Sequence, residues 1–142
     1  MILYVKQLML TYSNCSKGGK IVMELHESGE NYLETILILE RRNGIARSVD
    51  VANELNFSKP SVSRAVSVLK TAGYVEIGSI NQLVLTPSGR EIAEKIYERH
   101  CTIKEYLMQI GVSDKVASED ACKLEHVLSD EAYNCIKSLI KK

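Results

Sequence analysis

Residues 48–85 restrict the fold of this chain more than any other stretch. They begin with a short amphipathic segment that Ser48 can cap as a helix. A tight turn leads to a second helix, which Ser58 can cap and which ends at Gly73. Pro60 falls within the first turn of this second helix, where a missing backbone N–H is tolerated. Two helices of this size joined by such a turn predict a helix-turn-helix.

The residues that follow favour a β-hairpin. Residues 74–77 and 82–85 alternate like strands, and the turn residues 78–81 separate them. A hairpin directly after the second helix is the wing of a winged helix-turn-helix, and it argues against a plain helical hairpin. The predicted fold is therefore mainly α with a small β-hairpin wing, a winged helix-turn-helix followed by a helical domain.

The charge distribution supports a nucleic-acid partner for the first half. The formal net charge is zero, but residues 41–90 carry seven basic and three acidic residues, whereas residues 91–131 carry five basic and ten acidic residues. A basic half and an acidic half suggest a nucleic-acid reader joined to a cation-binding part. Small hydroxyl residues and cations at the start of a helix can reach phosphates and base edges in the major groove. The candidate DNA-binding residues are Arg47, Ser58, Lys59, Pro60, Ser61, Ser63 and Arg64.

Four further helices surround this unit in the sequence. One begins at Ser28 or Glu30 and ends at Asn43-Gly44, and a long one has Thr86 as its cap and ends at Gly111. A third covers about 113–128. The last is capped by Ser129, and its expected buried side holds Ala132, Cys135, Ile136, Leu139 and Ile140. The short amphipathic final helices favour a homodimer, because so small a core gains from burial between subunits.

The third of these helices carries a possible metal-binding pattern. Cys122, Glu125 and His126 are spaced i, i+3 and i+4, which places a thiol, a carboxylate and an imidazole on one helix face. Together they suit a borderline divalent transition metal such as Fe²⁺, Zn²⁺, Co²⁺ or Ni²⁺. Alone, the pattern is more often a packed cysteine beside solvated Glu and His residues, so further ligands are needed elsewhere in the chain.

Residues 30–140 resemble the diphtheria-toxin-repressor and manganese-transport-regulator family of metal-dependent repressors. The segments that carry the resemblance are 30–34 (ENYLE), 58–63 (SKPSVS), 85–89 (LTPSG), 99–100 (RH) and 120–131 (DACKLEHVLSDE). The resemblance implies a winged-helix domain followed by a dimerisation domain, with metal bound between them. Carried over by position, the implied ligands are Asn31, Glu34, His100, Cys122, Glu125 and His126.

The chain departs from the family pattern at positions that bear on the metal. Asn31 stands where iron-type members carry Met and manganese-type members carry Asp, and Cys122 follows the iron type. Lys104 and Ser118 stand where iron-type members carry second-site ligands, so that site cannot be built in the same way. The mixed set favours Fe²⁺, with Mn²⁺ second. Zn²⁺, Co²⁺ and Ni²⁺ can also occupy such a set in vitro.

The expected organisation has three parts. Residues 1–22 are a non-native or disordered extension, with Met23 as the natural start, because 13–20 has a coil composition and lacks periodicity. Residues 23–86 form the winged-helix DNA-binding domain, and 87–142 form the metal-binding and dimerisation domain. The four cysteines form no CxxC pair, which fits the reducing cytoplasm, and no stretch predicts a membrane span.

The predicted function is a metal-dependent transcriptional repressor, with Fe²⁺ or Mn²⁺, that controls metal homeostasis genes. As a two-fold dimer it would bind a palindromic double-stranded DNA operator. Two alternatives remain: a winged-helix regulator with an organic effector, and a redox sensor that acts through Cys122 or Cys101. No nucleophile triad, phosphate loop or HExxH motif is present, so an enzyme is not expected.

Overall fold

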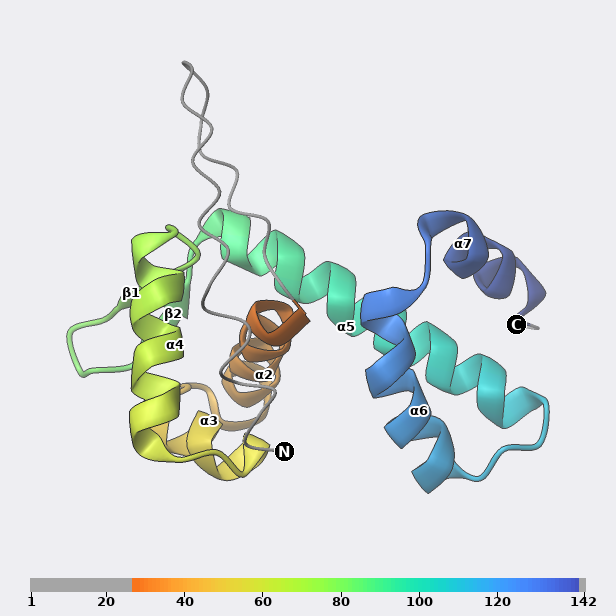
Figure 1. The fold of residues 1–142 in the computed structure, drawn as a ribbon, viewed down its shortest axis with the longest axis horizontal. Helices are drawn as coiled ribbons and strands as arrows, with labels where there is room; N and C mark the ends of the chain where they lie inside the picture. Colours follow the sequence, from red (N-terminus) through yellow and green to blue (C-terminus); the bar gives the residue numbers. More distant parts are fainter. Residues whose placement is uncertain (1–26, 141–142) are drawn as a thin grey trace, which may run out of the picture.

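The computed structural model describes residues 27–140, in which six helices and one two-stranded antiparallel sheet follow each other along the chain (Figure 1). The elements are α2 (Glu27–Asn43), α3 (Ser48–Leu55), α4 (Lys59–Thr71), β1 (Val75–Ile77), β2 (Leu83–Leu85), α5 (Pro87–Gln109), α6 (Asp114–Val127) and α7 (Asp130–Leu139). The predicted fold class is confirmed: α3 and α4 are the helix-turn-helix, and β1 and β2 are its wing.

The wing is attached to the rest of the fold at both strands. Val75 pairs with Leu85, Ile77 pairs with Leu83, and an isolated bridge joins Leu83 to Ala46. The start of α5 packs against the same sheet at Gly89, where an added Cβ would lie 2.0 Å from the Tyr74 carbonyl oxygen. Only glycine fits there, so the start of α5 packs directly on the backbone of the residue that precedes β1.

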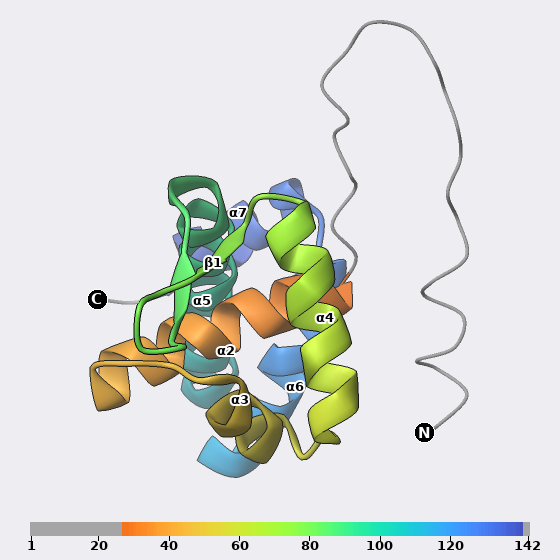
Figure 2. The ribbon, with the colours of Figure 1, turned by 90° about the vertical axis from the view of Figure 1, so that its left-hand side faces the viewer.

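α5 connects the two halves of the molecule. It runs from the winged-helix unit at one end to α6 and α7 at the other (Figure 1). Seen from the winged-helix end, α4 and the hairpin lie in front of α6 and α7 (Figure 2). The core of the winged-helix unit is apolar and includes the fully buried side chains of Leu33, Ile36, Leu37, Val51, Val62 and Val75. α2 forms part of this core and also packs on α5, so α2 belongs to the DNA-reading half while lying near the acidic half.

Most predicted helix caps agree with the structure, and one does not. Ser58, Thr86 and Ser129 each accept a hydrogen bond from a backbone N–H of the helix that follows, as expected. Ser48, in contrast, is the first residue of α3, and Arg47 occupies the cap position. The Asp50 carboxylate, in the first turn of α3, accepts a hydrogen bond from the backbone N–H of the cap residue Arg47 at 3.1 Å.

The side of the last helix that was predicted to be buried is largely exposed in the single chain. Tyr133 is the buried residue of α7, whereas Cys135 and Leu139 are exposed, Leu139 at 59%. The physical reason is that α7 follows one edge of α5, and nothing in 27–140 covers its apolar face. Val127 at the end of α6 and Ile110 just after α5 are similarly exposed, at 68% and 60%. The predictions for residues 1–22 and Met23 lie outside the described residues.

No helix between residues 27 and 140 has the length and apolar character needed to cross a membrane.

Candidate metal centre and nucleic-acid interface

Three helices bring acidic and imidazole side chains together at the junction of the two halves. α2 contributes Glu34, α5 contributes His100, and α6 contributes Glu125; one possible ligand atom of each lies within 4.8 Å of the others. The close packing of α6 is explained by Ala117 and Ala121, which are fully buried on the same face one turn apart. Glu125 follows Ala121 by one further turn, so the packing that buries the alanines also carries this carboxylate into the junction.

Glu125 is the centre of this group. Its side chain is fully buried, and its Oε2 lies 2.7 Å from Nδ1 of His100. Its other oxygen, Oε1, lies 3.2 Å from Nε2 of His126, but the geometry is not that of a hydrogen bond, and this buried oxygen has no hydrogen-bond partner in residues 27–140. A buried carboxylate oxygen without a partner is unfavourable. A cation at this oxygen would remove that penalty.

His126 connects the cluster to the first turn of α2. Its Nδ1 lies 2.9 Å from Oε2 of Glu30, and only 3% of its side chain is exposed. Glu30 was not among the predicted site residues. It lies four positions before Glu34, which places both on one face of α2, so extending the search for acids by one helical turn from Glu34 would have found it.

The pKa values of the cluster reflect two carboxylates held close together. Burial, and then the neighbouring Glu125, raise the pKa of Glu34 to about 7. Burial alone would raise the pKa of Glu125, but the hydrogen bond with His100 and the nearby imidazole of His126 hold it below the ordinary value. Glu34 therefore carries a proton in neutral solution far more often than an ordinary glutamate, because its negative charge is poorly compensated.

The carboxylates in turn raise the pKa values of the two histidines. The hydrogen bond to Glu125 raises the pKa of His100. Burial opposes the charged form of His126, but Glu125 and Glu30 together raise the pKa of His126 to about 9. In the absence of metal, protons on the imidazoles thus supply the positive charge that the carboxylates require. A divalent cation would take the place of those protons, so the donor set fits such an ion.

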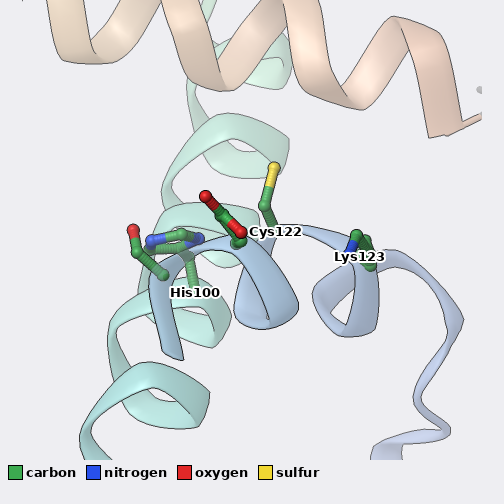
Figure 3. A pocket seen from close by; sticks show the side chains of 5 residues that line it. His100, Cys122 and Lys123 are labelled. Carbon is green, nitrogen blue, oxygen red and sulfur yellow. The ribbon is translucent and has the colours of Figure 1, made fainter. Parts of the chain in front are cut away.

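Cys122 lies at the edge of the cluster. It lines a pocket of about 500 Å³ together with His100, Ser118, Glu119 and Lys123. Its thiol extends from α6 toward α2, as Figure 3 shows. Burial, and then the nearby Glu125 and Glu34, raise the pKa of the thiol, so it is neutral unless a cation lies beside it.

The six predicted ligands therefore differ in their placement. Glu34, His100 and Glu125 lie together. His126 contacts this group through Glu125, and Cys122 lies at its edge, in the pocket that His100 also lines. Asn31 is half-buried one turn before Thr35, whose hydroxyl donates to the Asn31 carbonyl oxygen at 2.7 Å. No hydrogen bond of the Asn31 side chain to another residue of 27–140 is present.

The candidate DNA-binding residues gather around the start of α4. Ser58 accepts a hydrogen bond from the Ser61 backbone N–H at 3.3 Å, and the two hydroxyl oxygens are 2.8 Å apart. Ser61 is partly exposed, and its six companions in the predicted set, Arg47, Ser58, Lys59, Pro60, Ser63 and Arg64, are exposed. The predicted residues thus form one accessible surface at the first turns of α4 and the start of α3.

The two arginines of this surface differ from the other four arginines of residues 27–140 in how they are paired. Arg41, Arg42, Arg90 and Arg99 each bind a carboxylate within the described part of the chain, on Glu94, Glu54, Glu40 and Asp130 respectively. Arg47, Lys59 and Arg64 have no ion pair within the same residues. Cations that are exposed and unpaired are free to bind phosphate oxygens.

The fold and the site define a winged-helix DNA-binding protein with a candidate cation site between its two halves. Residues 24–79 match the family described as the N-terminal DNA-binding domain of iron-dependent repressors, and residues 86–142 match its metal-binding and dimerisation domain. The chain therefore belongs to the iron-dependent repressor family, which confirms the resemblance seen in the sequence. This is a family of transcriptional regulators and not of enzymes.

Individual relatives agree with this assignment. The chain is 38% identical over 120 residues to an uncharacterized HTH-type transcriptional regulator of Methanocaldococcus jannaschii, covering 83% of this chain and 96% of the relative. It is 34% identical over 128 residues to the transcriptional regulator MntR of Escherichia coli O157:H7, covering 89% and 83%. It is 36% identical over 114 residues to MntR of Geobacillus kaustophilus, covering 80% and 81%.

Solved structures share the fold. The manganese regulator SloR superposes with a TM-score of 0.69 at 26% identity, and IdeR of T. acidophilum with a TM-score of 0.69 at 27% identity. The matches cover 82% and 84% of this chain but 54% and 55% of those chains. The chain thus spans about half the length of these two structures.

Proposed function

We propose that this protein binds Fe²⁺ or Mn²⁺ at the junction of α2, α5 and α6, and that the bound ion favours repression of metal homeostasis genes through DNA binding. The observation that carries the proposal is the convergence of Glu34, His100 and Glu125 from three helices within 4.8 Å. One of these helices belongs to the winged-helix unit and two to the acidic half. An ion held by all three would therefore connect the half that reads DNA to the half that dimerises.

The proposed ligands are Asn31, Glu34, His100, Cys122, Glu125 and His126. A bound divalent ion would supply positive charge that lets Glu34 and the Cys122 thiol lose their protons. Glu125 offers the buried oxygen that lacks a partner, and His100 and His126 offer imidazole nitrogens on either side of it. Asn31 offers a neutral amide oxygen from α2.

The choice between the two metals follows from the mixed donor set. Thiolate is a soft ligand that favours Fe²⁺ over Mn²⁺, whereas carboxylate and amide oxygens suit both ions. Fe²⁺ is accepted by both kinds of donor, so we propose iron as the native ion with manganese second. Zn²⁺, Co²⁺ and Ni²⁺ can occupy the same donors in vitro.

The coupling between metal and DNA acts through the position of α2. Without the ion, Glu34 and Glu125 are two crowded carboxylates, so the α2 side of the junction gains little from approaching α6. With the ion, both carboxylates are attracted to one point, and the winged-helix unit is held in one position relative to the dimerisation helices. A coupling of about 1–3 kcal/mol would change DNA affinity roughly 5- to 150-fold.

The proposed DNA contacts come from the surface at the start of α4. Ser58, Lys59, Pro60, Ser61, Ser63 and Arg64 enter the major groove, and Arg47 reaches the phosphate backbone beside it. Because the family carries a dimerisation domain, we propose a homodimer whose two recognition helices read a palindromic operator. Residues 23–86 form the DNA-reading part and 87–142 the metal-binding and dimerising part, and the cytoplasm is the proposed location because it holds the DNA.

The test is a DNA-binding titration with and without metal. Duplexes are selected from a random pool with the Mn²⁺-loaded protein. Affinity for the selected duplex is then measured with a chelator and with Mn²⁺, anaerobic Fe²⁺ or Zn²⁺. The proposal predicts an increase of roughly 5- to 150-fold with metal, lost in His126→Ala and kept in the control Glu98→Gln, whose exposed carboxylate pairs with Lys137 on α7. Equal affinity with and without every metal would contradict it and favour an organic effector.

A further inference from the structure

Glu30 is an acidic residue that contacts His126 at this junction and that the predicted ligand set leaves out. It lies in the first turn of α2, about a quarter of its side chain is exposed, and its Oε2 is 2.9 Å from Nδ1 of His126. His126 makes no other hydrogen bond with the described residues at Nδ1. Its ring is otherwise enclosed, with 3% of the side chain exposed.

We propose that Glu30 is a positioning residue for His126: its carboxylate accepts the Nδ1–H hydrogen bond, fixes the ring plane, and leaves Nε2 as the nitrogen that binds the metal. The inference rests on the proposed metal-binding function and deepens it. Glu30 touches the imidazole and acts on the ion only through it.

The geometry on the other side of the ring supports this role. Nε2 of His126 lies 3.2 Å from Oε1 of Glu125, and that oxygen is buried and lacks a hydrogen-bond partner among the described residues. This nitrogen and this oxygen face each other without forming a hydrogen bond. Histidines that bind metal through one nitrogen commonly donate the other N–H to a carboxylate, which orients the ring and raises its basicity.

The hydrogen bond between Glu30 and His126 also connects the two halves of the molecule. Glu30 belongs to α2 of the winged-helix half, whereas His126 belongs to α6 of the acidic half. The hydrogen bond therefore joins the two halves through a residue that is not itself a ligand. Loss of this hydrogen bond should weaken both metal binding and the attachment of α2 to α6.

Two substitutions separate the hydrogen bond from the charge. Glu30→Ala and Glu30→Gln both remove the negative charge of the Glu30 side chain, but only glutamine keeps an oxygen that can accept from Nδ1–H. Glu40→Ala is the matched control, because Glu40 is a partly exposed carboxylate on the same helix that pairs with Arg90 instead. Circular dichroism of each metal-free variant checks that the helices are intact.

The first measurement is the dissociation constant for Zn²⁺ by competition with a chelating dye. Glu30→Ala should weaken binding roughly 10- to 100-fold, Glu30→Gln should recover most of the loss, and Glu40→Ala should match the wild type. The second measurement is the ¹⁵N spectrum of the His126 ring in the Zn²⁺-loaded protein. It should show a protonated Nδ1 and a metal-bound Nε2.

The outcomes distinguish this inference from the proposed function. If the wild type binds no metal, the proposed function fails. If the wild type binds metal but Glu30→Ala binds equally well, or if Nδ1 is the metal-bound nitrogen, Glu30 does not position His126 and only this inference fails. If Glu30→Gln binds as weakly as Glu30→Ala, the charge and not the hydrogen bond is what matters, and the positioning role is also refuted.

Discussion

Replacing Glu34 by glutamine should make the metal-free protein more stable while weakening its metal binding. The Glu34 side chain is buried beside Glu125; burial, and then this neighbouring carboxylate, raise the pKa of Glu34 to about 7 from its ordinary value of 4.5. A raised pKa means that the folded protein binds a proton more tightly than the unfolded chain, so stability falls as pH rises from about 4.5 to about 7. Glutamine has nearly the same shape and no charge to lose, so Glu34→Gln should escape this fall.

The expected size follows from the shift in pKa. A shift from 4.5 to about 7 corresponds to a penalty on the order of 3 kcal/mol, which is fully present above pH 7 and absent below pH 4.5. Urea denaturation at pH 4, 6 and 8 in the presence of a chelator would measure it. At pH 8 the midpoint of Glu34→Gln should exceed that of the wild type by roughly 1 to 3 M urea, given slopes of about 1–3 kcal/mol per molar.

The comparison of wild type and variant removes contributions from the other titrating groups, since both proteins contain them. Glu40→Gln serves as a control, because Glu40 is paired with Arg90 and its loss should bring no gain at any pH. Equal stability of wild type and Glu34→Gln at pH 8 would refute the reasoning, because Glu34 would then not be a crowded carboxylate. A variant that is more stable but binds metal as tightly as the wild type would show that Glu34 is not a ligand.

Three further predictions address other parts of the molecule. Arg64→Ala should weaken binding to the selected DNA by about 1–3 kcal/mol, because Arg64 is exposed and has no ion pair within residues 27–140; unchanged affinity would remove it from the interface. Cys122→Asp should shift activation of DNA binding toward Mn²⁺, because the soft donor is lost, and an unchanged ranking of metals would mean that Cys122 is not a ligand. Leu139→Lys should convert a dimer into a monomer in sedimentation at micromolar concentration, because the exposed face of α7 is the expected subunit contact; a wild-type monomer would contradict this.

The sequence was most informative where local chemistry determines the structure. Ser58 with Pro60 and Thr86 with Pro87 predicted the starts of α4 and α5, because a capping hydroxyl and a proline in the first turn act within four residues. The wing followed from its alternating residues and turn. Ser48 failed as a cap because the helix begins one residue earlier than expected: the Asp50 and Val51 N–H groups donate to the Arg47 carbonyl oxygen, which makes Arg47 the cap residue.

The site was predictable only in part because it depends on how helices pack. The spacing of Glu125 and His126 shows that both lie on one side of α6, but not that Glu125 is fully buried with one oxygen lacking a partner. The contact between Glu30 and His126 joins residues 96 positions apart, and no local pattern marks it. The face of α7 that was predicted to be buried is largely exposed in the single chain, because periodicity cannot distinguish a face that packs in the core from one that packs on a partner subunit.

The central claim is that side chains from α2, α5 and α6 hold one divalent ion between the two halves. The most direct test is an anomalous difference map from crystals grown with Mn²⁺. We expect a peak whose ligands include Glu34, His100 or His126, and Glu125, so that all three helices contact the ion. A peak coordinated only by residues of α5 and α6, with Glu34 turned away, would contradict the proposed link between metal and the DNA-reading half.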